Sequence, residues 1–281
     1  AVLPRGRIFA WLSSRTCRSN SERILRPGRL RSLYSPPLLV HHEKMTFQSV
    51  ARTHVGAVRS CNEDSVLAHS DNGLWAVSDG MGGHAAGDVA SALVVDALKA
   101  VAAGGDAHRL MQAAQTALAD ANAELYRRGS SQSASRTMGA TVAVLGADAS
   151  SYICLWAGDS RVYRFRAGKL VRLTHDHRYV QSLIDAGLLS EKEAEEHPRR
   201  SVITRAVGVD AELKLDVCEG ALVAGDIFLL TTDGVTGVCK DAEIAAILSR
   251  GDIESAADAI VEKCLAGGAP DNLSLVLVRL S

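Results

Sequence analysis

Short apolar runs and longer amphipathic stretches alternate from Phe47 to the end of the chain. Apolar runs of strand length that end in turn residues predict buried strands at 74–78, 141–145, 152–157, 161–166, 227–232 and 273–280. Longer segments rich in Ala and Leu, with apolar residues at helical spacing, predict helices at 85–103, 107–128, 242–249 and 253–266. A shorter helical segment is predicted over 177–197.

The predicted strands and helices come in blocks rather than in strict alternation. Such blocks are typical of an α+β fold, in which helices pack on the outer faces of antiparallel sheets. The short Gly158-Asp159-Ser160 turn separates two predicted strands and therefore predicts a hairpin between them.

Residues 1–44 differ from the rest of the chain, because they are rich in Arg and hold only Glu22 and Glu43 as acids. A segment of this composition buries little apolar surface, so we expect a disordered or non-native extension, with Met45 as the natural start. A transit peptide has a similar composition and is the alternative. Residues 45–281 are expected to form a single domain.

The composition excludes several classes of protein. A net charge of -1 gives no basic field for nucleic acid or anionic lipid. The longest apolar stretches carry charges and are too short to cross a bilayer. Six well-separated cysteines without a C-x-x-C pair indicate reduced thiols. We therefore expect a cytoplasmic protein that binds neither nucleic acid nor membrane.

Four aspartates share one position, at the start or end of a predicted apolar strand: Asp79, Asp159, Asp233 and Asp271. Carboxylates at strand ends can be held rigidly and still face solvent, as a site for a hard cation requires. Each aspartate alone is also an ordinary turn residue, which is the alternative. Oxygen ligands without nearby His or Cys favour Mg or Mn over Zn or Cu.

Two neighbouring segments carry further candidate chemistry. In an extended strand Arg59 and Glu63 would point to one face, and the guanidinium would suit a phosphate group. A surface salt bridge is the alternative. The glycine-rich segment 79–84 lacks the Gly-Lys-Ser/Thr of a phosphate-binding loop, so its glycines are expected to let backbone carbonyls approach a metal or water.

In this order, six short motifs closely resemble the bacterial members of the metal-dependent protein phosphatase family, also called the protein phosphatase 2C family. They run from about Thr53 to the C-terminus and are Arg59-x-x-Asn62-Glu63-Asp64, Asp79-Gly80-Met81-Gly82-Gly83-His84, Gly139-Ala140-Thr141, Gly158-Asp159-Ser160-Arg161, Thr231-Thr232-Asp233-Gly234 and Asp271-Asn272.

The resemblance implies a sandwich of two antiparallel sheets flanked by helices. It also implies a serine/threonine protein phosphatase, in which water activated by two Mn or Mg ions hydrolyses phosphoserine and phosphothreonine on proteins. The expected partners are phosphorylated proteins, including a serine/threonine kinase and its targets. A monomer is expected.

The resemblance also assigns roles to single residues. Asp79 is expected to bridge the two ions, and Asp233 and Asp271 to complete the first one. Gly80 is expected to offer its carbonyl oxygen to the second ion, which Glu63 reaches through water.

The remaining assignments concern a third ion, the phosphate and a variable segment. Asp159 together with Asp233 matches a third, weaker metal site, and Arg59 matches the arginine that binds phosphate. Residues 174–208 resemble the flap of bacterial members, where His175, His177 and His197 are expected to be solvated or to touch substrate, beside the positive charge of Arg199, Arg200 and Arg205.

One departure from the pattern concerns the proton donor. Many eukaryotic members have His after the Asp-Gly pair, whereas this chain has Met81. His84 is a candidate donor, although a structural hydrogen bond at a helix start is the favoured role. The general acid stays unassigned, with solvent as a candidate.

Three other functions compete with an active phosphatase. The first is a catalytically silent module that keeps the fold for binding or regulation, and the second is a phosphatase-fold partner of a sigma-factor switch. The third is a calcium-binding module, which is disfavoured because the candidate ligands span far more sequence than a compact loop.

Overall fold

The computed structural model describes residues 46–281, except 83–85, 103–104 and 132–137. The predicted extension at 1–44 lies outside these residues and stays a prediction. The description below concerns the unit formed by 42–281 alone.

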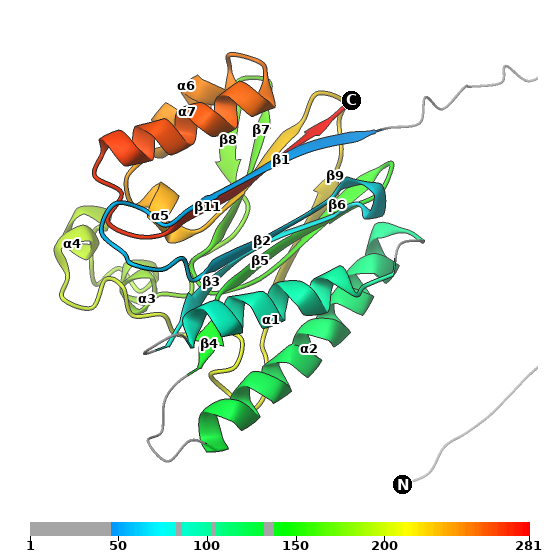
Figure 1. The fold of residues 1–281 in the computed structure, drawn as a ribbon. Coiled ribbons are helices and arrows are strands. Elements are labelled where there is room, and N and C mark those ends of the chain that lie inside the picture. The colour runs from blue at the N-terminus through cyan, green and yellow to red at the C-terminus, as the bar shows by residue number, and fades with distance from the viewer. Residues whose placement is uncertain (1–45, 83–85, 103–104, 132–137) are drawn as a thin grey trace, which may run out of the picture. The chain divides into compact units, whose positions relative to one another are not determined.

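Two antiparallel sheets form the centre of the fold (Figure 1). The five-stranded sheet has the order β1 (Phe47–His54), β11 (Leu273–Leu280), β10 (Ile227–Thr231), β7 (Arg161–Arg166) and β8 (Lys169–Arg172). The six-stranded sheet has the order β2 (Asp64–His69), β3 (Leu74–Met81), β5 (Val142–Ala147), β6 (Ser151–Ala157) and β9 (Asp216–Ala221), with β4 (Gly139–Ala140) paired to the end of β3.

Helices cover the outer face of each sheet (Figure 1). The six-stranded sheet carries α1 (Gly87–Lys99) and α2 (Ala107–Ser131), and the five-stranded sheet carries α6 (Asp241–Leu248) and α7 (Ile253–Ala266). Shorter elements occupy the connections: η1 (Ser70–Asn72), α3 (Tyr179–Asp185), α4 (Glu191–Glu196) and α5 (Asp233–Thr236). The predicted sandwich with flanking helices is therefore confirmed.

Three apolar cores hold the four layers together, one between the sheets and one under each pair of helices. Trp75, Phe228 and Val276 lie in the central core between the sheets. Because the inner strands are covered on both faces, their sequences are continuous apolar runs rather than alternating ones. All residues of β5 and β10 are buried.

The predicted strands and helices are present, with bounds that differ by a few residues. Four longer strands were not predicted, β1, β2, β8 and β9, and these four form the edges of the two sheets. Edge strands are partly exposed, so they carry the mixed polar and apolar residues that weaken the sequence signal.

The predicted hairpin at Gly158-Asp159-Ser160 is wrong, because β6 and β7 belong to different sheets. Both edges of β6 are already paired, with β5 and β9, so the chain crosses to the other sheet. Gly158 allows this crossing through its positive φ of 114°. The crossing brings Asp159 to the ends of strands from both sheets.

Candidate active site

Five aspartates from both sheets gather at one end of the sandwich, and we call them the acidic cluster: Asp64, Asp79, Asp159, Asp233 and Asp271. Asp64 begins β2 and lies directly opposite Asp79 in the β2–β3 pair. Burial raises the pKa of Asp79 well above its usual range, and the four other carboxylates raise it further. The structure therefore brings the four aspartates predicted from strand ends together and adds Asp64.

Burial and mutual repulsion disfavour the fully ionised form of the acidic cluster. Burial is the largest cause of the rise that brings the pKa of Asp64 and of Asp159 to about 7. Burial and the Asp271 carboxylate also raise the pKa of Asp233. Such carboxylates require cations or protons for stability.

Hydroxyl groups hold the cluster in place from behind. Thr141 Oγ1 accepts a hydrogen bond from the Asp79 backbone N–H (3.0 Å) and lies 2.7 Å from Ser160 Oγ. The Thr232 hydroxyl donates to Asp64 Oδ2 (2.8 Å). These bonds join the ends of β2 and β3 to the crossing between the sheets and to the end of β10, so the carboxylates are fixed relative to one another.

Asn272 fastens the loop before β2 to the start of β11. Its side-chain amide donates to the carbonyl oxygens of Val55 (2.8 Å) and Cys61 (2.9 Å). Its side-chain oxygen accepts from the backbone N–H of Glu63 (2.8 Å). Residues 59–63 form a bent loop held by these bonds rather than an extended strand.

Arg59 reaches the cluster from this loop. Its Nη2 lies 2.7 Å from Asp271 Oδ2, and about half of its side chain is exposed to solvent. An exposed guanidinium at the edge of an acidic cluster can meet an anionic group that arrives from solvent. Arg59 pairs with Asp271 rather than with Glu63, so the salt bridge is present while the guanidinium also faces solvent.

Glu63 and Gly80 converge on the beginning of α1. A Cβ placed at Gly87 would lie 2.6 Å from Glu63 Oε1 and 2.8 Å from the Gly80 carbonyl oxygen. A Cβ placed at Gly80 would lie 1.9 Å from the Gly87 carbonyl oxygen. Both positions therefore require glycine. The Glu63 carboxylate and the Gly80 carbonyl oxygen, which the family resemblance assigns to one ion, both lie beside Gly87.

The chemistry of the cluster suits hard divalent cations such as Mn and Mg, because its donors are carboxylate and carbonyl oxygens. Asp64 Oδ1 and Asp159 Oδ1 are buried acceptors without a hydrogen-bond partner among the described residues. Within the same residues, no three acidic, His or Cys side chains are arranged closely enough to form a ligand group. The carboxylates are neighbours with unused oxygens rather than a closed ligand shell.

The predicted flap, 174–208, contains α3 and α4, in agreement with the predicted helical segment. The expectation that His177 is a solvated loop histidine is wrong, because His177 is buried and its ring stacks on Trp156. Its Nδ1 accepts from the Gly158 N–H (3.1 Å), so its Nε2 carries the proton toward Asp216 (3.2 Å). Burial lowers the pKa of His177. Through its bond to Gly158, His177 anchors the flap to the crossing beside Asp159.

Three other predicted flap residues have partners within the flap. His175 Nε2 lies 2.8 Å from Asp185 Oδ2, and His197 Nδ1 accepts from the Arg199 N–H (3.0 Å). The Arg199 guanidinium lies 5.4 Å from the ring centre of Tyr179. The expectation for His84 lies outside the described residues.

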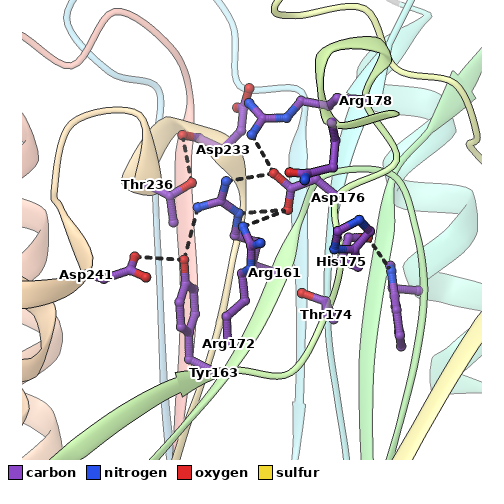
Figure 2. A network of polar contacts seen from close by, with 12 residues as sticks. Arg161, Tyr163, Arg172, Thr174, His175, Asp176, Arg178, Asp233, Thr236 and Asp241 are labelled. Carbon is purple, nitrogen blue, oxygen red and sulfur yellow. Dashed lines mark hydrogen bonds and ion pairs between the residues drawn. The ribbon is translucent and has the colours of Figure 1, made fainter. Parts of the chain in front are cut away.

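A buried ion network lies at the start of the flap (Figure 2). Asp176 is 1% exposed and accepts two bonds from Arg161, at 2.9 and 2.7 Å, and one from Arg178 at 2.5 Å. Burial raises the pKa of Asp176, but the bonds from Arg161 outweigh burial and hold it below its usual range. Tyr163 extends the network to Asp241 (3.0 Å). Sequence reasoning missed this network, because only the fold brings Arg161 and Tyr163 of β7 beside Asp176, Arg178 and Asp241.

Residues 53–266 match the sequence family described as Protein phosphatase 2C. The chain belongs to the protein phosphatase 2C family. It is 36% identical over 237 residues to the serine/threonine protein phosphatase PstP of Mycobacterium tuberculosis, covering 83% of this chain and 45% of PstP. The chain therefore spans about half the length of that relative.

Solved structures agree with the family. PppA, described as a key regulatory component of T6SS in Pseudomonas aeruginosa, superposes with a TM-score of 0.78 at 39% identity, covering 84% of this chain and 100% of that one. The catalytic domain of PstP in complex with 2 manganese ions superposes with a TM-score of 0.75 at 32% identity, covering 84% of this chain and 99% of that one.

Among the described helices of this chain, none has the length and apolar character needed to span a bilayer.

The acidic cluster predicts an unusual response to removing a charge. Without divalent cations at pH 8, Asp79→Asn should raise the melting temperature by a few degrees, because a carboxyl group whose pKa is raised on folding destabilises the folded state at any pH above its usual pKa. About 1 kcal/mol corresponds to roughly 2–4 °C in a domain of this size. Thermal denaturation in a chelator tests this effect, with Asp258→Asn on α7 as an exposed control. A melting temperature that falls in Asp79→Asn would contradict the repulsion described above.

Proposed function

We propose that this chain hydrolyses phosphoserine and phosphothreonine on proteins at a centre that binds two Mn or Mg ions. The observation that carries the proposal is the acidic cluster, in which buried carboxylates with unused oxygens lie beside an exposed arginine. Membership of the protein phosphatase 2C family supports it. So do the serine/threonine phosphatase name of PstP and the two manganese ions of its catalytic domain.

The proposed ligands are those that the family pattern assigns. Asp79 would bridge the two ions, with Asp233 and Asp271 on the first and the Gly80 carbonyl on the second. Glu63 would reach the second ion through water. Asp64 lies opposite Asp79 and has a buried free oxygen, so we add it as a residue that contributes negative charge and accepts a hydrogen bond from a coordinated group.

When bound, the two cations would lower the pKa of a water molecule and neutralise the phosphoryl oxygens. The residues of the chain would supply the remaining functions. Thr141 and Thr232 keep Asp79 and Asp64 in fixed positions, which avoids reorganisation during the reaction. Arg59 would bind the phosphoryl group from the solvent side.

A serine/threonine kinase and its targets are the proposed partners, and a cytoplasmic monomer is the proposed form. The alternative is a module that keeps the fold and binds metal without catalysis. The complete set of aspartates Asp79, Asp233 and Asp271 favours the enzyme over this module.

The proposal predicts hydrolysis that depends on metal and on the acidic cluster. The full chain should hydrolyse p-nitrophenyl phosphate and a phosphothreonine peptide with Mn²⁺ and lose this activity in a chelator. Asp79→Asn and Asp233→Asn should each reduce kcat/KM on the order of a hundredfold or more, because each removes a metal ligand.

Asp258→Asn provides the control for this experiment, since Asp258 pairs with Arg52 at the surface and is not a member of the acidic cluster. Its activity should match that of the unchanged chain. If the chain binds Mn²⁺ but hydrolyses neither substrate, the binding module replaces the enzyme.

Arg59 gives a separate prediction that distinguishes phosphate binding from a salt bridge. Arg59→Ala should lower kcat/KM for the phosphopeptide by about 10- to 100-fold, because a charge-assisted bond to the phosphoryl group is lost. Arg59→Lys should recover only part of the loss, since an ammonium group lacks the planar fork. Steady-state kinetics test this point. Unchanged kcat/KM in Arg59→Ala would leave only the salt bridge to Asp271.

A further inference from the structure

Arg178 occupies a firmly held position at the entrance of the flap. It immediately precedes α3 and forms an isolated β-bridge with Ile203. Backbone bonds on both sides secure it, from the Tyr179 N–H to the Val202 oxygen and from the Thr204 N–H to the His177 oxygen, both at 2.8 Å. The backbone therefore fixes where the Arg178 side chain begins.

The guanidinium of Arg178 is also oriented. Its Nη2 donates to the buried carboxylate of Asp176, which Arg161 holds from the other side. Figure 2 shows the Arg178 and Asp233 side chains extending toward one another above this network. The positive charge of Arg178 acts on Asp159 as well as on Asp233, opposing the effect of burial on both pKa values.

Two buried polar atoms of Arg178 and Asp159 lack partners among the described residues. Arg178 Nε is a buried donor without an acceptor, and Asp159 Oδ1 is a buried acceptor without a donor. A buried polar group without a partner is costly, so each of these atoms is expected to be satisfied by a water molecule or another bound group. A divalent cation would serve Asp159 but would leave the Arg178 donor unsatisfied and repel its charge.

We infer that Arg178 is a built-in cation for Asp159 and Asp233, and that it excludes the third divalent ion predicted at these two residues. The inference rests on the proposed two-ion centre, and it limits that centre to two ions. Arg178 would thereby offset the negative charge of Asp233 and Asp159 without an exchangeable ion.

The test counts bound Mn²⁺ in the metal-stripped full chain, through the electron paramagnetic resonance signal of free Mn²⁺ during a titration. The unchanged chain should bind two ions. Arg178→Ala should bind a third ion at least about tenfold more tightly than the unchanged chain does, because a like charge has been removed. Arg178→Gln serves as a second charge-removing variant, and circular dichroism checks that each variant is folded.

Three matched variants separate charge from structure. Arg178→Lys keeps the charge and should bind two ions. Arg172→Ala removes a neighbouring arginine that also faces Asp176, at 3.7 Å, and should bind two ions as well. In the double variant Arg178→Ala with Asp159→Asn, the third ion should be lost again.

Two results would overturn the inference alone: a third ion bound by the unchanged chain as tightly as by Arg178→Ala, or two ions in both. Fewer than two ions in the unchanged chain would overturn the proposed centre first, and this inference with it. The titration of the unchanged chain therefore separates the two failures.

Discussion

The repulsion among five closely placed carboxylates is the interaction on which the rest of this structure depends. Burial and proximity raise the pKa values of Asp64, Asp79, Asp159 and Asp233, so the fold holds these groups together against their own electrostatics. A protein tolerates such an arrangement when the groups serve a function and the surroundings are rigid. The sandwich supplies the rigidity, because each aspartate lies at the end of a strand or at a crossing between the sheets.

Similar side-chain contacts surround the acidic cluster on each side. Short hydroxyl and amide side chains fasten the strand ends to one another, while arginines at the rim balance the charge. Asn272 binds the loop that carries Arg59 and Glu63, and Thr141 binds both Asp79 and Ser160. On the flap side, the Asp176 network holds Arg161 and Arg178 toward Asp233. The acidic cluster is thus enclosed by guanidiniums on two sides.

Much of this could be predicted from the sequence, because inner strands and long helices carry clear periodic signals. The edge strands could not be predicted in the same way, since partial exposure mixes their residues. The hairpin error at Gly158-Asp159-Ser160 had another cause, because a short turn does not reveal that β6 is already paired on both edges.

The candidate site, like the fold, could be predicted from the sequence only in part. Aspartates at strand ends were recognisable from local sequence, and the family motifs gave them roles. Asp64 was missed as a site residue because its importance depends on lying opposite Asp79 across a strand pair. Arg178 and Asp176 were missed because only the folded flap brings them beside residues that are distant in sequence.

The central claim is that the acidic cluster holds two divalent cations. The most direct measurement is a crystal structure of the full chain grown with Mn²⁺, with the ions located by anomalous scattering. The account predicts two ions that both contact Asp79, one of them also bound by Asp233 and Asp271. An ordered structure with Mn²⁺ only at the surface, and none among these carboxylates, would contradict the account.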